Sequence, residues 1–234
     1  SNAFTGRNGV EATRAVTSAV AAAMSLPEGR VFSSSTGVIG EPLPHARITA
    51  KIDELVAALD EDGIAGAAHA IMTTDTFPKG AGTLVDLCGE TVGIAGILKG
   101  SGMIMPNMAT MLCYLFTDAA IEASLLDRVL RETVDRTLNS VTVDGDTSTS
   151  DTCMLFATGA AGGAVIDSVD DPRLDAFRSG LETVLRDLAH QLVKDGEGAS
   201  KFVEITVEGA VSPDSAKTIG MHIANSPLIK TAMA

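Results

Sequence analysis

One stretch of the sequence combines a glycine-rich loop, a polar turn and a hydroxyl group at the start of an apolar run. It covers residues 99–118, KGSGMIMPNMATMLCYLFTD, and Thr110 opens its apolar part. A β-branched Thr suits the start of a strand, and spacing alone favours that structural role. The alternative is that Thr110 is a nucleophile whose own amine becomes its general base once the chain is cleaved before it. The small Ala109 on the other side of that bond would leave room for a tetrahedral intermediate.

The other chemistry-bearing residues do not form metal or phosphate motifs. No HExxH or HxH arrangement occurs among the four histidines, which are His45, His69, His190 and His222. A calcium site of the EF-hand type needs a Gly and a Glu that are missing around Asp144, Asp146 and Asp151. Asx or ST turns fit these residues better. The KGSG sequence at residues 99–102 lacks the G-K-[ST] ending of a phosphate loop. We therefore expect no metal site.

The composition limits the classes of protein and partner. The chain has 234 residues, of which 45% are hydrophobic and 20% charged, as in a globular chain of one large or two small domains. The formal net charge of −13 makes nucleic acid a poor partner. No apolar run approaches the roughly 20 residues of a membrane span, and nothing resembles a signal peptide. Three widely spaced cysteines in apolar surroundings predict buried thiols in a reducing cytoplasm: Cys88, Cys113 and Cys153.

The elements that must position these residues alternate between helix and strand, which predicts a layered α/β or α+β domain. Helical spacing of apolar residues predicts helices over residues 8–24, 48–59, 65–72, 121–138 and 172–192, and after Ser212-Pro213. Strands are expected over residues 31–34, 110–116, 141–143 and 202–207, with two more within residues 83–98 that join near Gly89-Glu90. The GAAGG sequence at residues 159–163 is interpreted as a surface loop rather than a domain boundary.

The stretch around Thr110 resembles the processing site of the ornithine acetyltransferase family, the bifunctional glutamate N-acetyltransferases of arginine biosynthesis. Six further strings resemble that family in the same order: NAFTG at 2–6, SSTGVIGEPLP at 34–44, AIMTTDTFPK at 70–79, VDGDTSTSDT at 143–152, DGEGASKF at 195–202 and NSPLIKTA at 225–232. They cover essentially the whole chain. The resemblance implies an α/β layered sandwich of the Ntn-hydrolase-like type.

The resemblance implies autoproteolysis at the Ala109–Thr110 bond. The freed Thr110 would then take acetyl from N-acetylornithine and pass it to glutamate, with its α-amine as general base because the reference pKa of that group is close to neutral. In the family, the Thr and Gly of the STG motif form the oxyanion hole. Those residues are Thr36 and Gly37 here.

The family pattern also implies three substrate contacts, which are Thr73, Lys99 and Glu197 in this sequence. Lys99 offers a cation for a substrate carboxylate, and Glu197 offers an anion for the ornithine ammonium. Without the family, Thr73 would be a helix-end hydroxyl and Lys99 a solvated side chain. No bound cofactor is implied, although acetyl-CoA is a candidate second acetyl donor.

The resemblance also predicts how the chain is organised. Family members extend beyond both ends of this sequence, so residues 1–234 correspond to the central portion of one acetyltransferase. Residues 1–109 would end the α chain and residues 110–234 would begin the β chain. The family further implies αβ units that assemble into a homo-oligomer. Two alternatives stay open: a catalytically incompetent or partner-binding piece of such an enzyme, and a self-processing aminopeptidase of the same fold.

Overall fold

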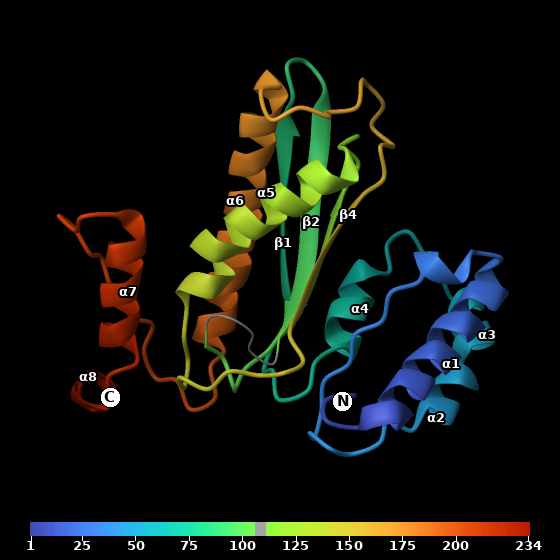
Figure 1. The fold of residues 1–234 in the computed structure, drawn as a ribbon, viewed down its shortest axis with the longest axis horizontal. Helices are drawn as coiled ribbons and strands as arrows, with labels where there is room; N and C mark the ends of the chain where they lie inside the picture. The colour runs from blue at the N-terminus through green and yellow to red at the C-terminus, as the bar shows by residue number, and fades with distance from the viewer. Residues whose placement is uncertain (106–110) are drawn as a thin grey trace.

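The centre of the molecule is a mixed β-sheet (Figure 1). The computed structural model describes residues 1–105 and 111–234. Over those residues, four strands lie in the order β1-β2-β3-β4. They are β1 (Lys79–Asp86), β2 (Thr91–Lys99), β3 (Leu112–Thr117) and β4 (Thr152–Ala157). β2 pairs antiparallel with both β1 and β3, whereas β4 runs parallel to β3. A parallel pair requires a crossover, and here it passes through helix α5 (Ala123–Arg136).

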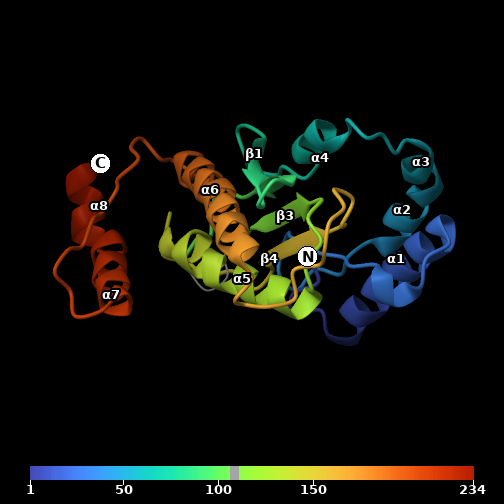
Figure 2. The same ribbon diagram turned by 90° about the horizontal axis from the view of Figure 1, so that it is seen from above.

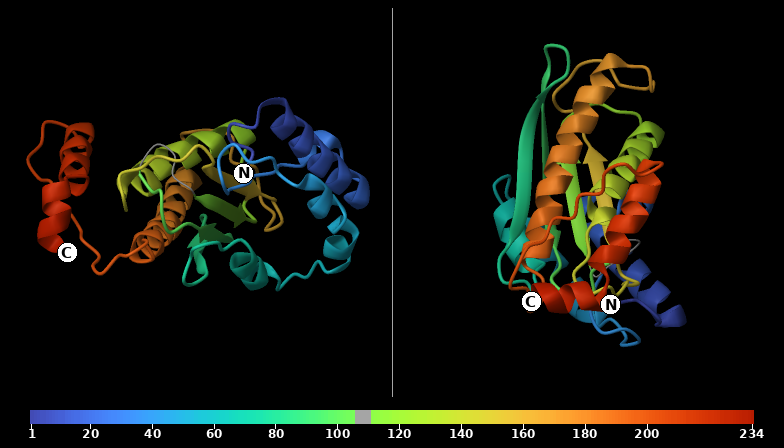
Figure 3. Two further views of the ribbon diagram at one scale, coloured as in Figure 1. Left: turned by 90° about the horizontal axis from the view of Figure 1, so that it is seen from below. Right: turned by 90° about the vertical axis from the view of Figure 1, so that its left-hand side faces the viewer.

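Helices surround this sheet along the described part of the chain. Besides α5, the α-helices are α1 (Gly6–Met24), α2 (His45–Thr49), α3 (Ile52–Ala57), α4 (Ile64–Ala70), α6 (Pro172–Lys194), α7 (Pro213–Ala224) and α8 (Pro227–Met233). Two short 3₁₀ turns are η1 (Glu28–Arg30) and η2 (Leu138–Ser140). The pair α7 and α8 lies on the side of the sheet opposite to α1, α2 and α3 (Figures 1, 2 and 3).

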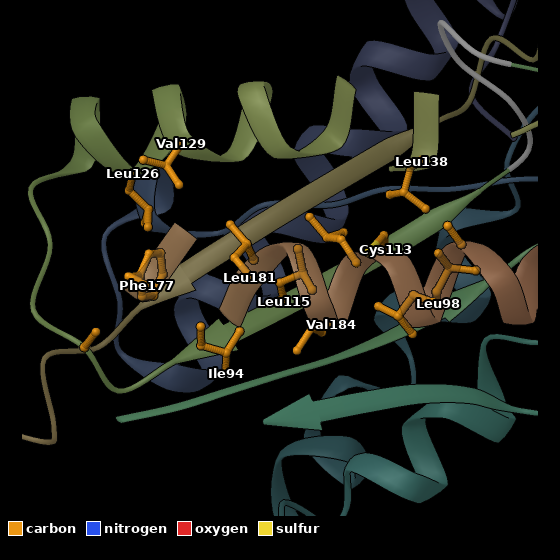
Figure 4. Packing of buried hydrophobic residues seen from close by; sticks show 14 of the residues in the cluster. Ile94, Leu98, Cys113, Leu115, Leu126, Val129, Leu138, Phe177, Leu181 and Val184 are labelled. Atoms are coloured by element: carbon orange, nitrogen blue, oxygen red, sulfur yellow. The ribbon is translucent and has the colours of Figure 1, made fainter. Parts of the chain in front are cut away.

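The hydrophobic core lies between the sheet and helices α5 and α6 (Figure 4). Helix α6 begins where the carboxylate of Asp171 accepts the N–H of Arg173 at 2.9 Å and Pro172 occupies the first turn. Its buried stripe includes five side chains with 0% exposure: Leu174, Phe177, Leu181, Leu185 and Leu188. Burying a side chain of this size stabilises the fold by about 1.5–3 kcal/mol. The long α6 stripe therefore fixes where the C-terminal end of the helix lies.

The opposite face of the sheet carries an aromatic cluster. The rings of Phe116 and Phe156 stack at 5.5 Å between centroids, and Phe32 meets Phe156 edge-on at 6.2 Å. Two residues further on, the hydroxyls of Ser34 and Tyr114 are hydrogen-bonded. These contacts hold the segment before Thr36 and Gly37 against β3 and β4.

The layered α/β class predicted from the sequence is confirmed by this arrangement. The expected strands within residues 83–98 are β1 and β2, and residues 112–117 form β3. The expected helix over residues 172–192 is α6. Over the described residues, no helix has both the length and the apolar character that a bilayer crossing requires.

Three predicted strands are wrong. Residues 31–34, 141–143 and 202–207 contain no assigned strand, although Val31 and Val141 have extended backbones. Local sequence favours extended backbone, but a strand also needs a neighbouring edge with which to pair. Conversely, the sequence pattern does not predict β4, because its short apolar segment directly follows a polar run. Short apolar segments of this kind can form buried parallel strands.

Two smaller expectations are also corrected. The helix expected over residues 48–59 is two short helices, α2 and α3, separated near Ala50 and Lys51. Cys88, expected to be buried, is exposed because it lies in the tight turn between β1 and β2, where its φ is 59°. Cys113 is buried as expected, and Cys153 is half-buried.

Candidate active site

The sheet topology brings several distant segments to one end of the sheet. Lys79 opens β1 opposite Leu98, near the end of β2, and Lys99 is paired with Leu112 at the start of β3. Leu112 is in turn paired with Thr152, which opens β4. The chain segments that precede β1, follow β2 and precede β3 and β4 therefore meet at this end.

A cavity of about 460 Å³ lies at this end of the sheet. Five of the residues that the family pattern singled out line it: Thr36, Gly37, Thr73, Lys99 and Glu197. They come from segments up to 161 positions apart in the chain, counted from Thr36 to Glu197. Ser148 and Ser150 add hydroxyl groups to the lining. Another cavity, of about 330 Å³, lies against α7 and contains none of these five residues.

Lys99 lies at the floor of the cavity with only 1% of its surface exposed. Its ammonium donates to Thr73 Oγ1 at 2.8 Å and lies 4.0 Å from Asp75 Oδ2. Burial lowers the pKa of the Lys99 ammonium; Asp75, Asp151 and Glu197 oppose that shift, while Lys79 adds to it. Lys99 is therefore a buried cation surrounded mainly by negative charge, not the solvated lysine of the structural alternative.

Glu197 reaches the cavity from the loop that follows α6. Its backbone N–H donates to the carbonyl of Ser101 at 3.1 Å, and the hydroxyl of Ser101 donates to the carbonyl of Asp195 at 2.6 Å. A Cβ atom on Gly102 would lie 2.7 Å from the carboxyl carbon of Glu197, so a side chain at that position would displace the carboxylate. The glycine-rich loop after β2 thus provides the space into which Glu197 extends.

Gly37 has a φ of +147°, in the region that favours glycine. Without a Cβ atom, its backbone can approach a reacting oxygen closely. The preceding contacts of Phe32 and Ser34 with the sheet fix the segment that carries it. The Thr36 hydroxyl and the backbone of Gly37 can therefore face the cavity from a segment that is held against the sheet.

The predicted nucleophile and cleavage bond, Thr110 and Ala109, lie outside the described residues. The first described residue after them is Met111, whose N–H donates to Asp151 Oδ1 at 2.9 Å. Burial raises the pKa of Asp151 to about 7, although the Met111 N–H and Lys99 act against the rise. The sequence around Asp151 suits an Asx or ST turn and does not indicate its contact with the residue before β3.

The sequence of the whole chain, residues 1–234, matches the family model described as ArgJ family. The chain belongs to the ArgJ family. The predicted resemblance is confirmed. Similar proteins include the arginine biosynthesis bifunctional protein ArgJ of Ruegeria pomeroyi, 56% identical over 234 residues, which are 100% of this chain and 56% of that protein. The ArgJ protein of Rhizobium meliloti is 55% identical over 236 residues, covering 100% of this chain and 57% of that protein.

The chain therefore spans a little over half the length of these ArgJ relatives. A crystal structure of the arginine biosynthesis bifunctional protein ArgJ from Bacillus halodurans matches with a TM-score of 0.48 and 37% sequence identity. That match covers 50% of this chain and 54% of the other.

In this ArgJ-family chain, a group of buried charges beneath the cavity was not expected from the sequence. Lys79, with 0% exposure, donates to Asp75 Oδ1 at 2.7 Å and to Asp195 Oδ2 at 2.5 Å. Burial acts to raise the pKa of Asp75, but hydrogen bonds from Lys79, Gly100 and Thr73 outweigh it and hold that pKa below its ordinary value. Asp75 and Lys79 belong to the AIMTTDTFPK string and Asp195 opens the DGEGASKF string, but only the fold reveals that Lys79 contacts both carboxylates.

Proposed function

We propose that the protein containing this chain transfers acetyl from N-acetylornithine to glutamate through an acetyl-Thr110 intermediate, after autoproteolysis at Ala109–Thr110. One observation carries the proposal: in a chain of the ArgJ family, a single cavity gathers Thr36, Gly37, Lys99 and other predicted site residues. Membership of the family does not by itself bring these residues together, and the cavity adds a place where they can act on one molecule.

The activation step uses groups of the chain itself. The Thr110 hydroxyl attacks the Ala109 carbonyl, the acyl group moves from nitrogen to oxygen, and water hydrolyses the resulting ester. The step leaves a carboxylate on Ala109 and a free α-amine on Thr110. That amine has an ordinary pKa near neutrality, so it can accept the hydroxyl proton in the next reaction.

In the transfer itself, Thr110 Oγ attacks the acetyl carbonyl of N-acetylornithine, and the proton held by the α-amine goes to the leaving ornithine nitrogen. The glutamate amine then attacks the acetyl ester and restores the Thr110 hydroxyl. Thr36 and Gly37 stabilise the oxyanion in both halves, where loss of one donor typically costs about 10²–10³ in rate.

The remaining cavity residues fit the two amino-acid substrates. Both carry an α-carboxylate, which the buried Lys99 binds with the Thr73 hydroxyl beside it. Glu197 attracts the side-chain ammonium that only ornithine carries. A bound carboxylate would also offset the burial that disfavours the charged form of Lys99.

The proposal includes the organisation that the family implies. Residues 1–109 and 110–234 belong to the α and β chains, which stay associated and form a cytoplasmic homo-oligomer of αβ units. Acetyl-CoA serves as a second acetyl donor, so that the protein acetylates glutamate either from N-acetylornithine or from acetyl-CoA.

The test uses the full-length protein and its Thr110→Ala and Thr110→Ser variants. Intact-mass spectrometry measures cleavage, and isotope-labelled N-acetylornithine with glutamate measures transfer. We expect two chains and transfer for wild type, one chain and no transfer for Thr110→Ala, and partial retention of both for Thr110→Ser. A Thr110→Ala protein that still separates into two chains would refute the nucleophile. A wild-type protein that stays intact and inactive favours the partner-binding alternative, and release of N-terminal residues from peptides favours the aminopeptidase.

A further inference from the structure

One buried carboxylate contacts two of the three segments that carry predicted substrate contacts, those of Thr73 and Lys99. Asp75 Oδ2 accepts the N–H of Thr73 at 3.1 Å, and Asp75 Oδ1 accepts the N–H of Gly100, the residue after Lys99, at 2.7 Å. The side chain of Asp75 has 0% exposure. A single group therefore fixes the backbone on both sides of the cavity floor.

The same carboxylate also faces two lysines. Lys79 donates to its Oδ1 at 2.7 Å, and the Lys99 ammonium lies 4.0 Å from its Oδ2. Asp195, whose side chain is 2% exposed, takes a second hydrogen bond from Lys79 and also accepts the N–H of Thr76 at 3.0 Å. Two cations and two carboxylates thus balance in a buried cluster, and only Lys99 among these four lines the cavity.

Stability gives a weak reason for such a cluster. Removing ions from water is costly, and apolar residues of similar volume often serve stability equally well or better. A buried lysine without a counter-charge tends to lose its proton, since burial disfavours the ammonium. The charged groups that act on Lys99 are Asp75, Lys79, Asp151 and Glu197, and the effect of Asp75 is the largest of the four.

We propose that Asp75 is a positioning residue that keeps Lys99 charged and directed at the substrate carboxylate, with Lys79 and Asp195 holding Asp75 in place. This inference rests on the proposed function, because it gives Lys99 a substrate carboxylate to bind. It adds that the binding charge depends on a residue that does not line the cavity.

The first measurement is the protonation of Lys99 itself, which needs no catalytic activity. Competitive amine labelling with acetic anhydride across a pH series, read by peptide mass spectrometry, gives the labelling midpoint of Lys99 in the full-length protein. We expect Asp75→Asn to lower that midpoint by about one pH unit or more, as loss of a nearby opposite charge does. The matched control is Asp118→Asn: Asp118 accepts the N–H of Gly93 at 2.7 Å at the other end of β2 and should leave the midpoint unchanged.

The second measurement is the pH profile of acetyl transfer. In Asp75→Asn, we expect the alkaline limb of kcat/KM to move to lower pH for both N-acetylornithine and glutamate, mainly through KM. In a Lys99→Arg background the same substitution should not move the limb, because a guanidinium stays charged throughout this range. Retained self-cleavage, or otherwise a normal circular dichroism spectrum, shows that each variant has folded.

The outcomes separate the two proposals. An unshifted Lys99 midpoint in folded Asp75→Asn overturns the role of Asp75, whether or not the wild type transfers acetyl. If Asp75→Asn shifts the Lys99 midpoint but the wild-type protein transfers no acetyl, the role of Asp75 is supported and the proposed function is refuted. If Asp75→Asn does not fold, Asp75→Glu keeps the charge but displaces it, and a midpoint unchanged from wild type together with unchanged KM values counts against positioning.

Discussion

Replacing Lys79 by Met removes the cation that both Asp75 and Asp195 contact, while keeping a side chain of similar length. The side chains of the two carboxylates are 0% and 2% exposed, so water cannot replace the lost ammonium. Breaking a buried pair by removing one partner costs about 3–5 kcal/mol. Lys99 remains 4.0 Å from Asp75, and the N–H of Thr76 remains on Asp195, so we expect the lower end, about 3 kcal/mol.

A matched control separates burial from the ion pair itself. Lys51 Nζ lies 2.5 Å from Glu54 Oε2, as close as Lys79 lies to Asp195, but the two side chains are 64% and 70% exposed. Exposed pairs contribute about 0–1 kcal/mol, so Lys51→Met should lower the free energy of unfolding only slightly. Urea unfolding of the full-length variants at pH 7, followed by circular dichroism, measures both changes. Equal losses for Lys79→Met and Lys51→Met would refute the reasoning.

The pH dependence gives a second check on the same variant. Hydrogen bonds from Lys79 and other donors overcome the effect of burial and lower the pKa values of Asp75 and Asp195. Carboxyls with lowered folded-state pKa values stabilise the fold above their ordinary pKa of about 4, and that contribution is lost as the pH falls through the folded-state values. In Lys79→Met the unpaired carboxylates can take up protons instead. The gap between wild type and Lys79→Met should therefore be largest near pH 7 and narrow below about pH 4.

Two further predictions concern Thr36 and Gly37, which line the cavity, and Asp151, which accepts the N–H of Met111. Thr36→Ala should slow cleavage or transfer by about 10²–10³ while its circular dichroism spectrum stays normal. Gly37→Ala should also lower the urea midpoint, because the φ of Gly37 is +147°. Wild-type turnover in both variants would exclude Thr36 and Gly37 from the site. Asp151→Asn should gain stability over wild type as the pH rises from about 4 to 7, since the burial that raises the pKa of Asp151 to about 7 penalises its ionised form. Asn can still accept the Met111 N–H. If the difference in urea midpoint between Asp151→Asn and wild type is the same at pH 5 and pH 8, burial is not the cause.

The motifs identified cavity residues more reliably than the local patterns identified strands. A string such as AIMTTDTFPK names residues directly, and Thr73 from it lines the cavity. Strand patterns describe only the local backbone, so the pattern of residues 31–34 predicts a strand where no ladder forms, although the backbone of Val31 is extended. Residues 152–157 form a ladder because β3 offers a free edge, which no local pattern encodes.

Long-range ion pairing could not be predicted for a related reason. Lys79 and Asp195 are 116 positions apart, and their contact depends on where the long helix α6 ends. That end is set by five or more buried apolar side chains packed on the sheet, not by the charged residues themselves. A charge pattern in the sequence therefore shows which groups are available for pairing, and the core decides which of them meet.

The adjacency of the two central motifs, in contrast, follows from one hairpin. A turn centred between Gly89 and Glu90, as the sequence predicts, would place Lys79 opposite Gly100. The observed turn is centred one residue earlier and places Lys79 opposite Leu98. Because a change of two residues in the pairing keeps each side chain on the same face of the sheet, either register brings the segment before β1 beside the segment after β2. The contact of one carboxylate with both segments is therefore a consequence of strand length and turn position, and its chemistry depends on Asp75 standing four residues before Lys79.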